Sequence, residues 1–177
     1  EKAFLNTKAK RLDFISQLII EMTEKSASKN TLILVPSIAM GDLLSKYIEN
    51  SVFVNGQDSV KVRQKIYSLF QDRDDMRVIA TSHIASTGLD IPRVFMVVTI
   101  DGGKSFTRII QTVGRGLRKA ADKDSVIMLD ISSDLKYASK HRRERLKYYE
   151  EEKYPVKKSK FEYEKYFKNE DGQLKDG

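Results

Sequence analysis

The chain has 177 residues, of which 40% are hydrophobic and 32% charged, with a formal net charge of +7. This length supports one sizeable core, and the basic balance suits a polyanionic partner such as nucleic acid, although charge alone gives no specificity. The absence of cysteine excludes disulfides and thiolate metal sites, and two histidines cannot form a metal site alone. Without a membrane-length apolar run, a signal peptide or an initial methionine, the sequence predicts a piece of a longer cytoplasmic protein.

Apolar spacing predicts helices that alternate with short strands. A helix over residues 6–25 places Leu12, Ile15 and Ile19 on one face, and the apolar run 31–35 is typical of a strand buried on both faces. The other expected helices cover 41–48, a segment capped by Asp58 or Ser59, about 105–118 and about 133–153. The other expected strands cover 52–54, 77–80, 94–100 and 125–131. This alternation predicts an α/β fold with a parallel sheet and right-handed crossovers.

The composition changes after Asp134, which divides the chain into an expected domain over 1–134 and a basic helical extension with a tail over 135–177. Residues 140–147 carry five positive charges against one negative. This helix either holds nucleic-acid phosphates, through Arg142, Arg143 and Arg145, or presents a solvated face with Glu–Lys pairs. The tail aromatics Phe161, Tyr163, Tyr166 and Phe167 are expected to pack back onto the domain.

Residues 81–90 follow the expected strand 77–80. Ligands of open parallel sheets bind at the carboxyl ends of strands. Gly88 lets backbone amides approach a phosphate closely, and Asp90 can accept hydrogen bonds from a ribose hydroxyl. The alternative is a capped turn stiffened by Pro92.

The run Gln-Thr-Val-Gly-Arg-Gly-Leu-Arg, residues 111–118, contains two glycines within an expected helix. Each costs roughly 1 kcal/mol relative to alanine, so close approach to a ligand or another backbone is expected. Arg115 and Arg118 project from one side of such a helix, and their planar guanidinium groups suit phosphate oxygens. The alternative is a solvated basic face.

Residues 101–105, Asp-Gly-Gly-Lys-Ser, superficially resemble a phosphate-binding loop. That loop requires a glycine five residues before Gly103, where this sequence has Val98. We therefore expect an ordinary turn after a strand. No phosphate-binding loop with its lysine occurs elsewhere in the sequence.

Taken in order, these segments resemble the second RecA-like domain of superfamily 2 helicases over about residues 32–131. Residues 31–37 resemble motif IV, 78–92 motif V, and 111–118 the Gln-x-x-Gly-Arg-x-x-Arg form of motif VI. The resemblance implies a RecA-like parallel sheet flanked by helices, in the C-terminal motor domain of an ATP-dependent DNA helicase or branch-migration translocase. The implied location is the cytoplasm of a bacterium or of a phage-infected host.

The resemblance also implies residue roles. Arg115 and Arg118 reach the γ-phosphate of ATP with Gln111 nearby, and Gly88 and Asp90 face the nucleotide. The phosphates of branched or single-stranded DNA are held by residues at the strand ends: Ser37, Asn55, Gly56, Thr81 and Ser82. The ATP phosphate loop and the Mg²⁺ ligands are expected in an N-terminal RecA-like domain, so this chain alone should be inactive.

Thr112 departs from many RNA helicases, which carry arginine there, and this favours a DNA translocase. Two alternatives stay open. One is the motor of a restriction-system translocase, which a nuclease or modification domain elsewhere in the protein would reveal. The other is a non-catalytic nucleic-acid-binding module with a RecA-like fold, against which the intact Gln111, Arg115 and Arg118 argue.

Overall fold

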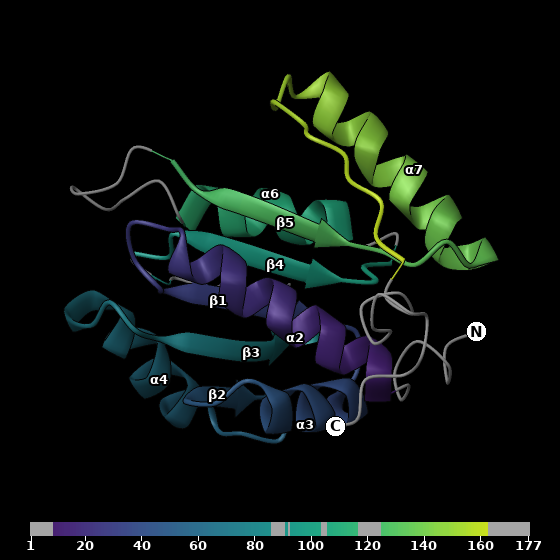
Figure 1. Cartoon of the computed structure of the whole chain (residues 1–177). Helices are drawn as coiled ribbons and strands as arrows, with labels where there is room; N and C mark the ends of the chain where they lie inside the picture. Colours follow the sequence, from purple (N-terminus) through teal and green to yellow (C-terminus); the bar gives the residue numbers. More distant parts are fainter. Residues whose placement is uncertain (1–8, 86–90, 92, 104–105, 117–124, 163–177) are drawn as a thin grey trace.

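The computed structural model describes residues 9–85, 91, 93–103, 106–116 and 125–162. Within them a five-stranded sheet has the order β2-β3-β1-β4-β5, and each neighbouring pair is parallel (Figure 1). The strands are β1 (Thr31–Val35), β2 (Ser51–Val54), β3 (Arg77–Thr81), β4 (Met96–Ile100) and β5 (Ile127–Ile131). The helices are α2 (Ala9–Glu24), α3 (Ile38–Tyr47), α4 (Val60–Asp72), α5 (Ser82–Ala85), α6 (Phe106–Gly116) and α7 (Lys136–Glu151). The predicted parallel α/β fold is confirmed.

Strand β1 lies at the centre of the sheet, and all five of its residues are buried, as predicted. Ile33 and Val35 join an apolar cluster with α2 and α3, whereas Leu32 and Leu34 join a second cluster with α4 and α6. The alternation of side chains along a strand therefore divides the core into two layers, one on each face of the sheet.

Helix α3 begins three residues before the predicted start at Gly41, because Ser37 caps it. The Ser37 hydroxyl oxygen accepts a hydrogen bond from the Met40 amide at 3.2 Å. Gly41 lies inside the helix, where a Cβ would be 2.2 Å from the Phe53 ring of β2. The missing side chain lets α3 and β2 pack closely, which sequence spacing does not reveal.

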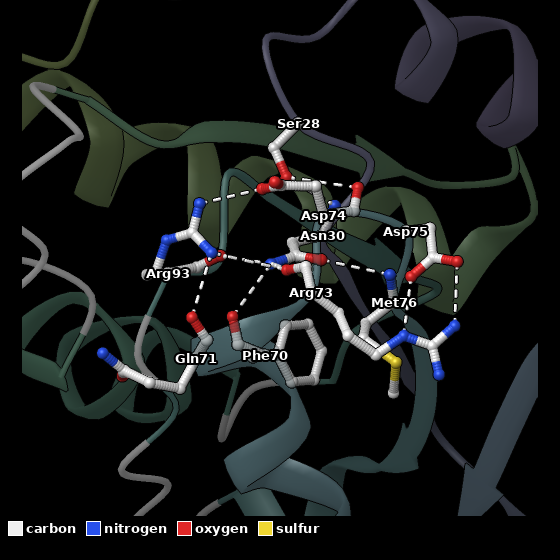
Figure 2. A network of polar contacts seen from close by, with 9 residues as sticks. All are labelled: Ser28, Asn30, Phe70, Gln71, Arg73, Asp74, Asp75, Met76 and Arg93. Atoms are coloured by element: carbon white, nitrogen blue, oxygen red, sulfur yellow. Dashed lines mark hydrogen bonds and ion pairs between the residues drawn. The ribbon is translucent and has the colours of Figure 1, made fainter.

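Asn30 organises the edge of the sheet at which the strands begin, as Figure 2 shows. Its side chain is fully buried directly before β1. Its amide nitrogen donates to the carbonyl oxygens of Phe70, Arg73 and Arg93 at 3.2, 2.6 and 3.1 Å, and its amide oxygen accepts from the Met76 amide at 3.0 Å. One side chain directly before β1 thus holds the segments that lead into β3 and β4.

Beyond α7, residues 152–162 run back alongside that helix (Figure 1). Lys158 lies 3.9 Å from Glu150, and Lys160 lies 3.7 Å from Asp134. The Phe161 ring is 5.9 Å from the Phe14 ring of α2 but stays 56% exposed, so this aromatic touches the domain without being buried against it. Tyr163, Tyr166 and Phe167 lie outside the described residues.

Candidate nucleotide and nucleic-acid interface

Three of the predicted contact segments lie along one edge of the sheet. Ser37 follows β1, Asn55 and Gly56 follow β2, and Thr81 and Ser82 stand where β3 ends. Because the strands are parallel and β2, β3 and β1 are neighbours, their carboxyl ends lie side by side. Polar residues far apart in the sequence are thereby brought to one edge, the usual ligand position in such sheets.

Ser37 is half-buried at the start of α3. Its hydroxyl oxygen already accepts the hydrogen bond from the Met40 amide. A hydroxyl group also has one hydrogen to donate. Ser37 can therefore hold α3 in place and donate to an anionic oxygen at the same time.

The turn after β2 is fixed by side chains rather than by its glycine. The Asn55 side-chain oxygen accepts from the Gln57 amide at 2.9 Å, and an Asp58 carboxylate oxygen accepts from the Asn55 amide at 2.7 Å. Gly56 is exposed, and a Cβ built on it would meet nothing within 4 Å. Gly56 therefore leaves an open surface on which another molecule's backbone can approach.

Strand β3 leads directly into α5, a four-residue helix that the sequence spacing did not predict. Thr81 is 7% exposed, whereas Ser82 is half-buried. Ser82 accordingly offers a ligand the larger accessible surface of the two. Gly88 and Asp90, the predicted nucleotide-facing pair of the same segment, lie outside the described residues.

Helix α6 begins after β4 and turns an apolar side toward the sheet. Phe106, Ile109 and Ile110 are buried, whereas Gln111 is exposed. Arg115 lies within the bounds of α6, but its side chain is outside the described part of the chain, as is all of Arg118. Gln111 is therefore the predicted nucleotide-facing residue whose surroundings the structure describes.

The turn after β4 has an internal role. The Asp101 carboxylate accepts from an Arg11 guanidinium nitrogen at 2.6 Å and from the Ser133 amide at 3.1 Å, with 3% of its side chain exposed. Burial raises the pKa of this carboxyl group, and the neighbouring Arg11 opposes the rise. At Gly102 a Cβ would lie 2.7 Å from the Phe106 ring. Asp101 thus faces the protein interior, in agreement with an ordinary turn.

Arg145 requires a correction, because it does not lie on the predicted nucleic-acid surface of α7. It is 1% exposed, and its guanidinium group pairs with the two carboxylate oxygens of Asp130 at 2.7 and 2.8 Å. It also donates to the Gly102 carbonyl and the Ser132 hydroxyl oxygen, while the Tyr149 hydroxyl donates to Asp130 at 2.9 Å. Arg145 therefore anchors α7 to the ends of β4 and β5.

The other two predicted arginines of α7 differ from each other. A guanidinium nitrogen of Arg142 lies 2.8 Å from an Asp134 carboxylate oxygen, so much of its charge is balanced within the chain. Arg143 is exposed, and with three exposed lysines it forms a row spaced by four, three and four residues, which places all four on one side of a helix. We call this row the basic stripe of α7: Lys136, Lys140, Arg143 and Lys147. The sequence indicated a basic helix, but not which of its charges face outward.

None of the helices in the described part of the chain is long and apolar enough to span a membrane. Across the same residues, no group of three or more His, Cys, Asp or Glu side chains could hold a metal ion.

Comparison with known proteins identifies the family. Residues 10–120 match the helicase conserved C-terminal domain. The chain is 24% identical over 166 residues to the ATP-dependent DNA helicase UvsW of Enterobacteria phage T4, covering 82% of this chain and 33% of that protein. It is 26% identical over 129 residues to the pre-mRNA-splicing ATP-dependent RNA helicase PRP28 of Scheffersomyces stipitis, covering 70% of this chain and 27% of that protein. The chain thus spans a third or less of these relatives.

Solved structures agree on the fold. The crystal structure of T4 UvsW superposes with a TM-score of 0.61 at 22% identity, covering 82% of this chain and 33% of that one. The C-terminal domain of the DEAD-box protein Dbp5 gives 0.59 at 19% identity, covering 82% of both chains. The likeness to the phage helicase that residues 111–118 suggest is thus confirmed, and the fold is RecA-like. With the match over residues 10–120, the chain belongs to the helicase conserved C-terminal domain family of superfamily 2 helicases.

Proposed function

We propose that this chain is the C-terminal motor domain of an ATP-dependent DNA helicase or translocase that acts on branched or single-stranded DNA in recombination and repair. The observation that carries the proposal is the row of polar groups at the carboxyl ends of β2, β3 and β1. Ser37, Gly56 and Ser82 offer a hydroxyl, an open backbone and a second hydroxyl along one edge. Such groups suit the phosphate backbone of a strand and read no base sequence.

In this proposal the nucleotide lies between the chain and an N-terminal RecA-like domain of the same protein. ATP with Mg²⁺ supplies the phosphoryl-transfer chemistry, and the metal ligands belong to that other domain. Arg115 and Arg118 neutralise the charge that develops on the transferred phosphoryl group, and Gln111 lies beside them. Gly88 and Asp90 contact the nucleotide. Cycles of domain closure and opening then move the contacts of Ser37 and Ser82 along the strand.

The basic stripe of α7 supports a second contact with the same nucleic acid. Four positive charges on one side of an exposed helix, of which Lys147 lies 3.8 Å from a Glu151 carboxylate oxygen, attract phosphates without reading sequence. The stripe follows β5, whereas Ser37, Gly56 and Ser82 follow the other half of the sheet. We therefore expect α7 to contact a separate stretch of a DNA strand or a second arm of a branched molecule.

Two isosteric glutamine substitutions test the interface at the carboxyl ends of the strands. Gln57 is exposed in the turn after β2, and Gln71 is exposed near the opposite edge, beside the Asn30 network (Figure 2). Both Gln57→Glu and Gln71→Glu change the net charge equally. We expect Gln57→Glu to weaken single-stranded DNA binding about three- to tenfold at low salt, because a carboxylate beside phosphates repels them.

Gln71→Glu is the matched control and should change affinity less than about twofold, because its added charge lies near the opposite edge of the sheet and acts mainly through the net charge of the chain. Fluorescence anisotropy with a labelled oligonucleotide measures both variants. Equal affinities for the two would contradict the proposed interface, and tighter binding to an RNA strand of the same sequence would contradict the assignment to DNA.

A further inference from the structure

Helix α7 has one face buried in the domain. Arg145 lies on that face, where its guanidinium group pairs with Asp130 of β5 at 2.7 Å and donates to the Gly102 carbonyl directly after β4. Ala138 and Tyr149 are buried on the same face, and Tyr149 joins the apolar cluster between the sheet and α6. Charged and apolar contacts together therefore fix α7 over the carboxyl ends of β4 and β5.

The basic stripe of α7 lies on the opposite face. Arg143 and Lys147 are each two residues from Arg145, which is about 200° around the helix, so the stripe points away from the sheet. Within the described part of the chain, neither Lys140 nor Arg143 has an ion-pair partner, whereas Lys147 lies 3.8 Å from Glu151. Most of the charge of the stripe is therefore available to a polyanion.

Residues 152–162 run beside α7 and add positive charge to this side of the domain (Figure 1). Lys158 lies 3.9 Å from Glu150, and Lys160 lies 3.7 Å from Asp134, with all four side chains largely exposed. Such exposed pairs contribute little to stability. They do balance two acidic groups that would otherwise repel a polyanion near the stripe.

The stripe and the polar groups at the other strand ends belong to one rigid sheet. Strand β5 is three positions from β3 in the sheet order. Three strand spacings cover about 14 Å, and a helix adds about 10 Å. The stripe and Ser82 are thus separated by roughly 15–25 Å. A ligand that meets both has to extend over that distance.

The stripe suits a duplex better than a single strand. Sites for single strands combine positive charge with aromatic side chains on which bases stack. The stripe contains no aromatic residue, and the exposed Tyr137 lies about 100° around the helix from Lys136. A straight row of charges about 16 Å long matches a stiff duplex, which carries one negative charge per about 1.7 Å of its axis.

We propose that α7 is a rigid docking arm for duplex DNA, held in place by the buried Arg145 anchor, and that the chain thereby selects DNA in which a duplex joins a single strand. This inference rests on the proposed function, in which the groups at the ends of β2, β3 and β1 hold the single strand. Two contacts on one rigid body reinforce each other, because binding at the first raises the effective concentration of DNA at the second.

A tailed duplex tests the docking arm in the 177-residue chain. Fluorescence anisotropy compares three labelled DNAs at equal salt: a duplex with a single-stranded tail, the same duplex without the tail, and the tail alone. Tails of both polarities are used. We expect the tailed duplex to bind at least about tenfold more tightly than either part, because both contacts are then made at once.

The double variant Lys140→Gln with Arg143→Gln removes two charges of the stripe. The preference for the tailed duplex should then fall to about twofold, while the affinity for the tail alone stays within about twofold of wild type. The matched control is Lys46→Gln with Lys65→Gln, which removes two exposed charges of α3 and α4. This control should keep the preference at about tenfold, because only the net charge changes.

Arg145→Lys tests the anchor separately. It preserves the net charge but loses the planar fork that meets Asp130 and Gly102. Circular dichroism shows whether the variant is folded. In the folded variant the preference should fall at least about threefold, with the affinity for the tail alone unchanged, because a loosened arm lowers the effective concentration. If this variant does not fold, the stripe variants decide alone.

The outcomes separate the inference from the proposed function. The inference is overturned by equal preferences in the stripe variant and its control, or by a wild-type preference in folded Arg145→Lys. If the stripe variant loses affinity for the tail alone as strongly as for the tailed duplex, the stripe holds the single strand and the inference is also wrong. Failure of the proposed function gives another result, equal binding of the tail alone by Gln57→Glu and Gln71→Glu.

Discussion

After β2, β3 and β1 the chain leaves polar groups at the surface, whereas after β4 and β5 it buries them in ion pairs. Gly56 and Ser82 represent the first half of this edge, with an open backbone and an accessible hydroxyl. Asp101 and Arg145 represent the second half, each almost fully buried and paired. Both halves have strand ends followed by polar residues, so residue type alone does not distinguish a ligand surface from an internal anchor. A ligand surface and an internal anchor are distinguished by whether the charged residue has an ion-pair partner within the chain.

Removal of the anchor on the buried half should have the largest effect. Arg145→Ala leaves the carboxylates of Asp130 and Asp101 without part of their compensating charge, and loss of one partner of a buried pair costs about 3–5 kcal/mol. Urea unfolding followed by circular dichroism measures the change. Arg143→Ala, two residues earlier on the same helix and exposed, should stay within about 0.5 kcal/mol of wild type. Similar losses in both variants would mean that α7 is not anchored through Arg145.

Alanine substitution should have different effects on stability at two glycines, Gly41 inside α3 and Gly56 in the turn after β2. Gly41→Ala forces a methyl group toward the Phe53 ring. Overpacking costs about 1–3 kcal/mol, which exceeds the gain of up to about 1 kcal/mol that alanine brings to a helix interior. We expect a net loss of about 1 kcal/mol in urea unfolding.

Gly56→Ala is the matched control, because nothing lies within 4 Å of the added methyl group. Its free energy of unfolding should match wild type within about 0.5 kcal/mol. A clear loss in Gly56→Ala would show that this turn needs glycine for its own fold, and would weaken the interpretation of Gly56 as an open approach to a ligand.

The smallest expected effects concern the basic stripe of α7. Lys140→Gln and Arg143→Gln should each flatten the plot of log K against log salt by about 0.7–0.9, the effect of one lost phosphate contact. The Lys65→Gln control alters an exposed charge of α4, beside the opposite end of the sheet, and should leave the slope unchanged. Anisotropy titrations at several salt concentrations give these slopes. If all three slopes equal that of wild type, the stripe is only a solvated surface.

The sequence predicted the fold better than the surroundings of individual charges. The run of residues in β1, bounded by polar residues and Pro36, has a local signature, and so does the cap at Ser59. The cap at Ser37 was not predicted. The four residues of α5 are too few to show a period, so that helix was missed. Spacing also placed the start of α3 too late, because the benefit of a glycine at position 41 depends on Phe53 across the layer.

The same contrast holds for the candidate site. Ser37, Gly56 and Ser82 could be placed at one edge from the sequence, because each follows a predicted strand and parallel strands end together. The burial of Arg145 could not be predicted, because its partners Asp130 and Gly102 are 15 and 43 residues away in the sequence. The sequence does contain a weak signal for the burial of Arg145. This residue shares one helix face with Ala138 and Tyr149, of which one is apolar and the other aromatic. Arg142 lies on the same face and is only half-buried, so that pattern narrows the choice of the buried charge without identifying Arg145.

The assignment of Arg115 and Arg118 to the nucleotide is the central claim, and hydrolysis measures it most directly. In the full-length protein with saturating DNA, Arg115→Ala or Arg118→Ala should lower kcat roughly a thousandfold or more, as loss of an arginine finger does, and lysine should restore little of it. DNA binding without nucleotide, measured by anisotropy, should survive in both variants. Near-normal turnover in both alanine variants would contradict the account, and loss of DNA binding with intact hydrolysis would assign these arginines to the nucleic acid instead.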